Sequence, residues 1–161
     1  TMERCTFEPE VNLDGISFDM VAWQGSTLLR ASLRGATFQG QDDEGLRGVR
    51  FQQCHLEGSL FIGMDLAEVS FTGCALQDAL FQQCRLDSST LIDLQCRLQG
   101  VRFVGCTVTD LSIESQGDLS SLSFQGCSIQ GLRLRGSFHN LSITGEDGAP
   151  LDDLDAQEVQ I

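Results

Sequence analysis

The sequence contains no lysine and no tyrosine, and it has only two prolines. All ten basic residues are therefore arginine, against 23 acidic residues, which gives a formal net charge of −13. This charge disfavours direct binding to nucleic acid, because phosphates need a basic surface to neutralise them. It disfavours binding to anionic membranes for the same reason.

Long hydrophobic segments are also missing. No apolar run approaches the roughly 20 residues that cross a membrane as a helix, so no membrane insertion is expected. Residues 1–4 lack the charged and then apolar pattern of an export signal, which predicts a cytoplasmic protein. Hydrophobic residues still make up 41% of the 161 positions, which suits one folded domain with a sizeable core.

The sequence does contain a period of five residues. From residue 49 it reads VRFQQ, CHLEG, SLFIG, MDLAE, VSFTG, CALQD, ALFQQ, CRLDS and STLID. Each block has a large apolar residue at its centre and a smaller residue two positions earlier. A period of five fits neither a helix nor a flat strand, so it predicts a chain that turns a corner every five residues. The centres of these blocks are Phe51, Leu56, Phe61, Leu66, Phe71, Leu76, Phe81, Leu86 and Leu91.

The same spacing continues on both sides of this segment. It is interrupted by three extra residues between Phe38 and Leu46, by two near Leu94, and by one near Gly117. These interruptions predict loops at corners. The further centres are Leu13, Phe18, Trp23, Leu28, Leu33, Phe38, Leu98, Phe103, Val108, Ile113, Leu119, Phe124, Ile129, Leu134, Phe138 and Ile143.

Phenylalanine and cysteine occupy different positions of the repeat. All ten Phe fall at centres, counting Phe7 as a further centre before Leu13, and all seven Cys fall two residues before a centre. Both positions are predicted to point inward, with Phe and Leu on alternate sides of the coil. Stacked Cys would lie about 4.8 Å apart, which is too far for the Cβ spacing of about 3.8 Å in a disulfide. We therefore expect free, buried thiols that pack as small apolar groups.

These blocks resemble the pentapeptide-repeat family, whose pattern is A(D/N)LXX. The resemblance runs from about Cys5 to Ile143, although Cys, Val, Leu and Ser often replace the small residue. It implies an all-β fold, a right-handed quadrilateral β-helix with coils of about twenty residues. We expect this β-helix over residues 1–145, with a loop insertion near 41–45, and a short acidic C-terminal cap or tail over 146–161.

Catalytic and metal-binding patterns are missing from the sequence. His55 and His139 are the only histidines, and no nucleophile motif, phosphate loop or zinc signature accompanies them. The sequence therefore predicts no enzymatic activity, no cofactor and no metal site.

Two surfaces are candidates for contact with a protein. The first is apolar and lies outside the side that holds Phe81: Leu60, Ile62, Leu80 and Val104 are expected to point outward from adjacent coils. The second is acidic, although Arg85 interrupts it by stacking over Asp65, so a solvated, self-paired surface remains open. The acidic candidates are Asp42, Asp43 and Glu44 in the loop and Asp65, Glu68, Asp87 and Asp110 in the repeats.

The favoured interpretation is a bacterial, non-enzymatic protein-interaction module, in which a rigid β-helix presents a surface to a protein partner of unknown identity. Homodimerisation and delivery by a secretion system remain open. The resemblance implies an alternative, since some pentapeptide-repeat proteins mimic DNA and bind DNA gyrase or topoisomerase, inhibiting it or protecting it from drugs. The charge of −13 agrees with this alternative in total, but the repeats carry only −5 of it, and the rest lies in the loop and in residues 146–161.

Overall fold

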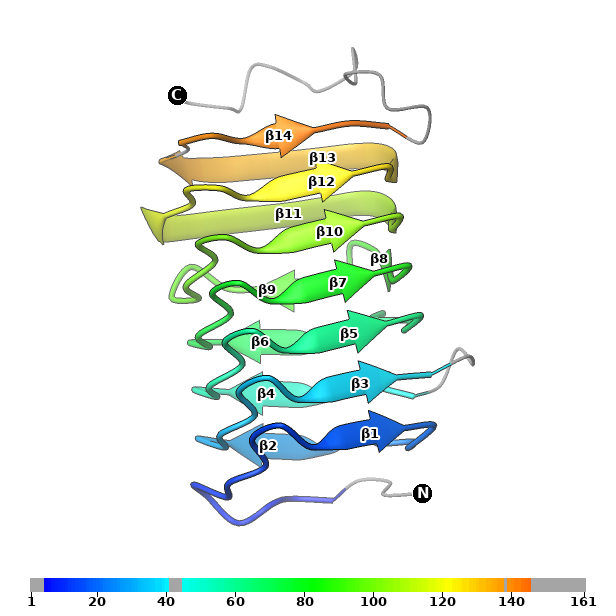
Figure 1. Cartoon of the computed structure of the whole chain (residues 1–161), viewed down its shortest axis with the longest axis vertical. Helices are drawn as coiled ribbons and strands as arrows, with labels where there is room; N and C mark the ends of the chain where they lie inside the picture. The colour runs from blue at the N-terminus through cyan, green and yellow to red at the C-terminus, as the bar shows by residue number, and fades with distance from the viewer. Residues whose placement is uncertain (1–4, 41–44, 138, 146–161) are drawn as a thin grey trace.

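The computed structural model describes residues 5–40, 45–137 and 139–145. Within these residues the regular secondary structure consists of short parallel strands that stack into a solenoid of about six coils (Figure 1). No helix in this part of the chain is long and apolar enough to span a membrane.

One sheet contains seven strands, one from each level of the solenoid. Every neighbouring pair is parallel and in register, so residues at the same level of the repeat lie directly above one another. In spatial order, which is also chain order, the strands are β1 (Ser17–Asp19), β3 (Thr37–Gln39), β5 (Leu60–Ile62), β7 (Leu80–Gln82), β10 (Arg102–Val104), β12 (Ser123–Gln125) and β14 (Ser142–Ile143).

A second sheet lies on the opposite side of the core. Its strands are also parallel, and the last two are long because they continue around a corner of the coil. The members are β2 (Thr27–Leu29), β4 (Arg50–Gln52), β6 (Ser70–Thr72), β9 (Leu91–Ile92), β11 (Thr107–Asp118) and β13 (Ser128–Ser137), and β8 (Arg85–Leu86) pairs with β11.

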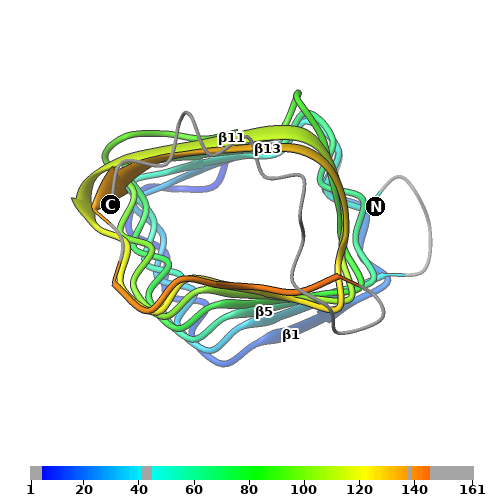
Figure 2. The ribbon, with the colours of Figure 1, turned by 90° about the horizontal axis from the view of Figure 1, so that it is seen from above.

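Viewed along its axis, the chain closes into a ring with the two sheets on opposite sides (Figure 2). Turns and isolated bridges form the other two sides. The ascending path is right-handed, and one coil takes 20 residues from Phe61 to Phe81 and 22 from Phe81 to Phe103. The expected right-handed, four-sided β-helix is therefore confirmed.

Phenylalanine rings line the inner face of both sheets. In the first sheet the rings of Phe38, Phe61, Phe81, Phe103 and Phe124 stack in a single column, with centroids 4.6–4.9 Å apart. This distance matches the spacing of neighbouring strands, so ring stacking and strand pairing share one period. The prediction that Phe occupies two opposite sides is confirmed by Phe51 and Phe71, which stack in the second sheet.

Leucine centres and cysteines fill the other two sides. Leu56, Leu66, Leu76 and Leu86 are completely buried, and six of the seven thiols are buried beside such centres. Each buried thiol also donates a hydrogen bond to a carbonyl of the coil below, as Cys106 does to Phe81 at 3.3 Å. Cysteine therefore combines a small volume with a weak donor that satisfies a buried acceptor.

One expected centre is wrong. Ile92, not Leu91, pairs with Phe71 and is buried. One of the two extra residues therefore lies between the centres Leu86 and Ile92, and the other lies between Ile92 and Leu98. Thr90 causes the shift by taking the small inward position. It is 4% exposed, and its hydroxyl donates to the carbonyl of Leu66 at 2.8 Å.

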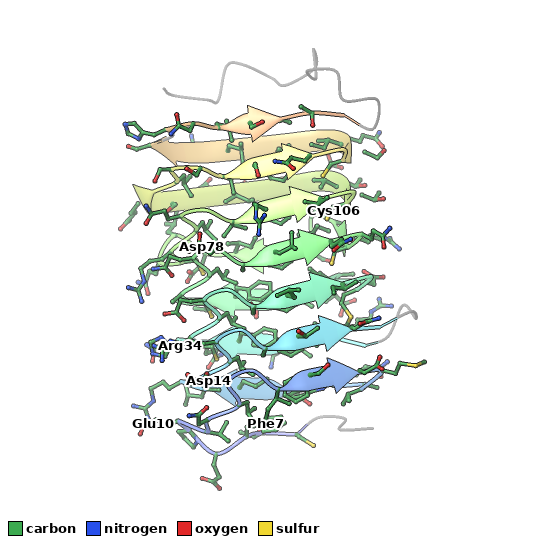
Figure 3. All side chains as sticks on the ribbon, in the orientation of Figure 1. Phe7, Glu10, Asp14, Arg34, Asp78 and Cys106 are labelled. Atoms are coloured by element: carbon green, nitrogen blue, oxygen red, sulfur yellow. The ribbon has the colours of Figure 1, made fainter. Side chains whose placement is uncertain are left out.

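The first coil is less buried than the rest. Phe7, Leu13 and Phe18 are only partly buried, because no described coil lies beneath them (Figure 3). Three other expectations lie outside the described residues: the loop at 41–44, the centre at Phe138, and the cap or tail at 146–161.

The corners require a left-handed backbone that was not anticipated. The residue two positions after a centre often has positive φ, as at Gly58 (66°) and Gly63 (65°). Glycine adopts this conformation without steric cost. Ten non-glycine residues in the described chain share it, including Glu68 and Asp78. The recurrence of Gly two residues after a centre was the sequence signal for these turns.

Candidate protein-interaction surface

The four apolar candidates lie on the outer face of the first sheet. Leu60 pairs in register with Leu80 on the next strand, and Gln82 separates Ile62 from Val104 in the neighbouring column. Their strand neighbours Phe61, Phe81 and Phe103 are completely buried, so the candidates point outward, as a strand requires.

All four side chains are half-buried. Residues in register on adjacent strands are close enough to shield each other, so Leu60 and Leu80 cover part of each other's surface. The side chains of the patch are consequently less exposed than isolated surface residues such as Met20, which is 68% exposed.

The rest of this outer face is polar but nearly uncharged. From β3 to β14, no outward position of the sheet is occupied by Asp or Glu, and the only charged side chain there is Arg102. Arg102 is exposed and forms no ion pair with another described residue. The outward positions are Thr37, Gln39, Leu60, Ile62, Leu80, Gln82, Arg102, Val104, Ser123, Gln125 and Ser142.

The acidic candidates lie on a different side, beside the Leu centres. Asp65 is only 9% exposed, and one of its oxygens accepts the backbone N–H of Ala67 at 2.9 Å. Its other oxygen is 3.6 Å from the Arg85 guanidinium, as the predicted stacking of Arg85 over Asp65 requires. Both oxygens of Asp65 thus have a partner within the protein.

Asp87 and Glu68 are also paired. Partial burial by itself would raise the pKa of Asp87, but hydrogen bonds from Ser89 and the charges of Arg85 and Arg47 outweigh it and lower this pKa. Glu68 accepts a hydrogen bond from Arg47 at 2.8 Å. The four acids in the repeats, Asp65, Glu68, Asp87 and Asp110, form an acidic stripe. Three of them therefore have an arginine within ion-pair distance.

Asp110 is the remaining described acid of the stripe, and it is exposed on a left-handed corner with a φ of 51°. Asp42, Asp43 and Glu44 lie outside the described residues. The structure therefore groups Asp65, Glu68 and Asp87 with Arg47 and Arg85, and it does not group the loop acids with them.

Several carboxylates also shape the turns, a role that the sequence interpretation missed. Asp65, Asp87 and Asp93 each accept the backbone N–H two residues later, at 2.9, 2.8 and 3.1 Å. This is the Asx-turn arrangement, which stabilises a corner locally. The signal was an Asp next to a centre, at the D/N position of the family pattern in the case of Asp65.

A polar network links successive coils on the opposite Leu-lined side, where Figure 3 shows Asp14, Arg34 and Asp78 one above another. A hydrogen bond of 2.6 Å from the Ser32 hydroxyl is the largest cause of the lowered pKa of Asp14. Glu57 lies 3.4 Å from both Arg34 and His55. His55 thus has charged neighbours, but they belong to a ladder of ion pairs between coils.

No group of three or more His, Cys, Asp or Glu residues in the described chain is arranged to hold a metal ion. Cys74 and Cys106 each lie between two other thiols. The hydrogen bond from Cys127 would lower the pKa of Cys106, but the hydrogen bond with Cys84 and burial outweigh it and raise this pKa to about 12.

Comparison with solved structures gives low overall similarity. The full-length form of QnrB1, a plasmid-mediated fluoroquinolone resistance protein, is 15% identical with a TM-score of 0.34, covering 97% of this chain and 91% of that one. The pentapeptide repeat protein Rfr23 from the cyanobacterium Cyanothece 51142 is 15% identical with a TM-score of 0.29, covering 88% of each chain. Values this low leave the partner of this chain open.

Comparison with curated proteins found no match. The family model of pentapeptide repeats does match, with eight copies over residues 46–93. The stacked coils continue on both sides of that segment with the same inward positions. Residues 46–93 therefore consist of pentapeptide repeats, and the flanking coils have the same solenoid architecture.

Proposed function

We propose that this chain is a non-enzymatic protein-interaction module that binds a protein partner through the outer face of the first sheet. The distribution of charge carries this proposal. In a chain of net charge −13, the face from β3 to β14 has no acidic side chain and has four apolar ones at its centre. An apolar centre inside a polar rim is the usual anatomy of a protein interface.

Rigidity favours the same face. Its strands are held in register on both edges, so the contact residues are already ordered and little conformational entropy is lost on binding. Pentapeptide-repeat solenoids are typically structural or binding proteins, which agrees with this role.

The test is a double substitution, Leu60→Asp with Leu80→Asp, in an immobilised chain exposed to a bacterial lysate. Both side chains point outward, so the coil should fold normally. Each buried Leu contributes about 1.5–3 kcal/mol at an interface, so partner retention should fall by at least about 100-fold.

The matched control is Gln52→Asp with Thr72→Asp. These residues are half-buried and pair in register on β4 and β6 of the opposite sheet, so the control adds the same charge in the same geometry. If both double variants fold and keep every partner of the wild type, the first-sheet face is not the binding site.

Mimicry of DNA toward gyrase or topoisomerase is a second candidate, favoured by the net charge of −13. Its acidic stripe would have to act although Arg47 and Arg85 pair with three of its members. The test is supercoiling by purified gyrase, in which an effect should weaken as salt screens the charges. Unchanged supercoiling with this protein in stoichiometric excess would exclude this candidate.

A further inference from the structure

We propose that the partner of the first-sheet face is a second copy of this chain, docked face to face about a two-fold axis that runs along β7. This inference rests on the proposed function, because it names the occupant of the same surface. It follows from the order of the strands, the order of the outward side chains and the absence of acids from this face between β3 and β14.

The strand order is symmetric about β7. This strand is the fourth of seven, with β1, β3 and β5 below it and β10, β12 and β14 above it (Figure 1). A two-fold axis along β7 places β5 opposite β10 of the second copy and β3 opposite β12. Both faces are then covered over their whole length, and the contact is isologous and closed.

The outward side chains are complementary under the same operation. Ile62 faces Val104 of the second copy, and Leu80 faces its own equivalent. Leu60 faces the aliphatic part of the Arg102 side chain, whose charged end can remain in water. All four apolar side chains thus meet apolar surface on both copies.

The polar positions also match. Gln82 lies on the axis and faces its own equivalent, and Gln39 faces Gln125 of the second copy. A glutamine amide both donates and accepts hydrogen bonds, so two opposed amides can satisfy each other. No pair brings two charges of the same sign together, because Arg102 is the only charged side chain between β3 and β14.

Charge selects this face for self-contact. Two copies of net charge −13 repel each other, and the repulsion is strongest where acids face acids. From β3 to β14 this face has no acid, so two copies can approach most closely there; the exposed Asp19 of β1 faces β14 of the second copy, which has no acid either. Salt should therefore strengthen the dimer, whereas it would weaken binding through the acidic stripe.

The area indicates a weak, reversible dimer. Seven strands about 4.8 Å apart and about 10 Å long give a flat projection of about 300 Å² per copy. A stable interface buries about 800 Å² of accessible surface per partner. Self-association should therefore depend strongly on protein concentration.

Sedimentation velocity over a concentration series, at 0.1 M and 1 M NaCl, tests the proposal. The Debye length falls from about 10 Å to about 3 Å between these conditions, so the dimer dissociation constant should fall by about tenfold or more. Gln82→Glu places two carboxylates against each other on the axis and should abolish dimerisation. The matched control Gln52→Glu makes the same change at the half-buried third position of β4 and should leave it unchanged.

A mixture of Gln82→Glu and Gln82→Arg chains distinguishes this arrangement from docking registers in which residue 82 does not face itself. Each variant alone should be monomeric, and the mixture should form heterodimers, because an axis along β7 places residue 82 against itself. Failure of the mixture to associate, or equal effects of Gln82→Glu and Gln52→Glu, would overturn the inference.

The proposed function can survive that outcome. If the wild type is monomeric in 1 M NaCl but loses partner capture on Leu60→Asp with Leu80→Asp, the face binds a different protein, and only the second-copy inference is overturned. If the wild type dimerises and the same double variant still dimerises, the contact lies on another surface, and this assignment is wrong.

Discussion

Removing one ring from the Phe column tests the core most directly. Phe81 is completely buried, and its ring stacks between Phe61 at 4.7 Å and Phe103 at 4.9 Å. Phe71 contacts it edge-on from the opposite sheet at 6.1 Å. Phe81→Ala therefore removes the transfer free energy of a buried ring and leaves a cavity between two coils.

The expected cost is about 3–5 kcal/mol, because that is the range for truncating a buried Phe. The upper half of this range is expected, since each aromatic pair adds about 0.5–1.5 kcal/mol beyond its buried area. For a chain of this size, such a loss lowers the melting temperature by roughly 8–15 °C. The assay is urea unfolding followed by circular dichroism, with thermal melts in parallel.

Two controls define the result. Gln82→Ala changes the outward neighbour and should stay within about 0.5 kcal/mol of the wild type. Phe18→Ala changes a partly buried ring of the first coil and should cost less than Phe81→Ala. Equal losses for Phe81→Ala and Gln82→Ala would refute the inward and outward assignment on which every surface argument depends.

Three further predictions concern the corners and the thiols. Gly63→Ala should destabilise the fold by about 1–3 kcal/mol more than Gly58→Ala. Both residues have nearly the same positive φ, but a Cβ at Gly63 would lie 2.7 Å from the Gly40 carbonyl oxygen, whereas a Cβ at Gly58 would meet nothing. Equal losses of stability in urea unfolding would contradict this. Asp65→Ala should lower the free energy of unfolding by about 1 kcal/mol, because it removes the acceptor of the turn N–H of Ala67. Asp65→Asn should lower it clearly less, because the amide oxygen can still accept that hydrogen bond. An equal loss for Asp65→Asn would assign the effect to the charge of Asp65. The six buried cysteines should react with a thiol reagent at pH 8 only as fast as the chain unfolds, because burial keeps the reagent away from them; rapid labelling of folded protein would show accessible thiols.

The five-residue period was enough to predict the inward positions, because each side of the coil repeats the same local geometry. It failed at Ile92, where two adjacent apolar residues both fit a centre and the hydroxyl of Thr90 decided the register by bonding to Leu66. The pairing of Arg47 with Glu68 could not be read from the period alone, because the two residues occupy different positions of the repeat, one residue after Leu46 and two residues after Leu66. Local repeats thus predict which side chains are buried, whereas contacts between side chains of neighbouring coils depend on how each corner directs them.

The core also determines where the acids are found on the surface. On the Phe-lined sides, rings that stack at 4.6–4.9 Å accompany regular strands, and of the three Asx turns described above only that of Asp93 lies beside such a strand. On the Leu-lined sides the chain bends, and Asp65 and Asp87 accept the N–H groups that the bends leave unpaired. Much of the acidity in the repeats therefore has a structural cause, and it need not reflect an acidic binding site. The same division leaves the outer face of the first sheet free of acids from β3 to β14, with four apolar side chains at its centre and polar ones around them, which is the anatomy of a protein interface.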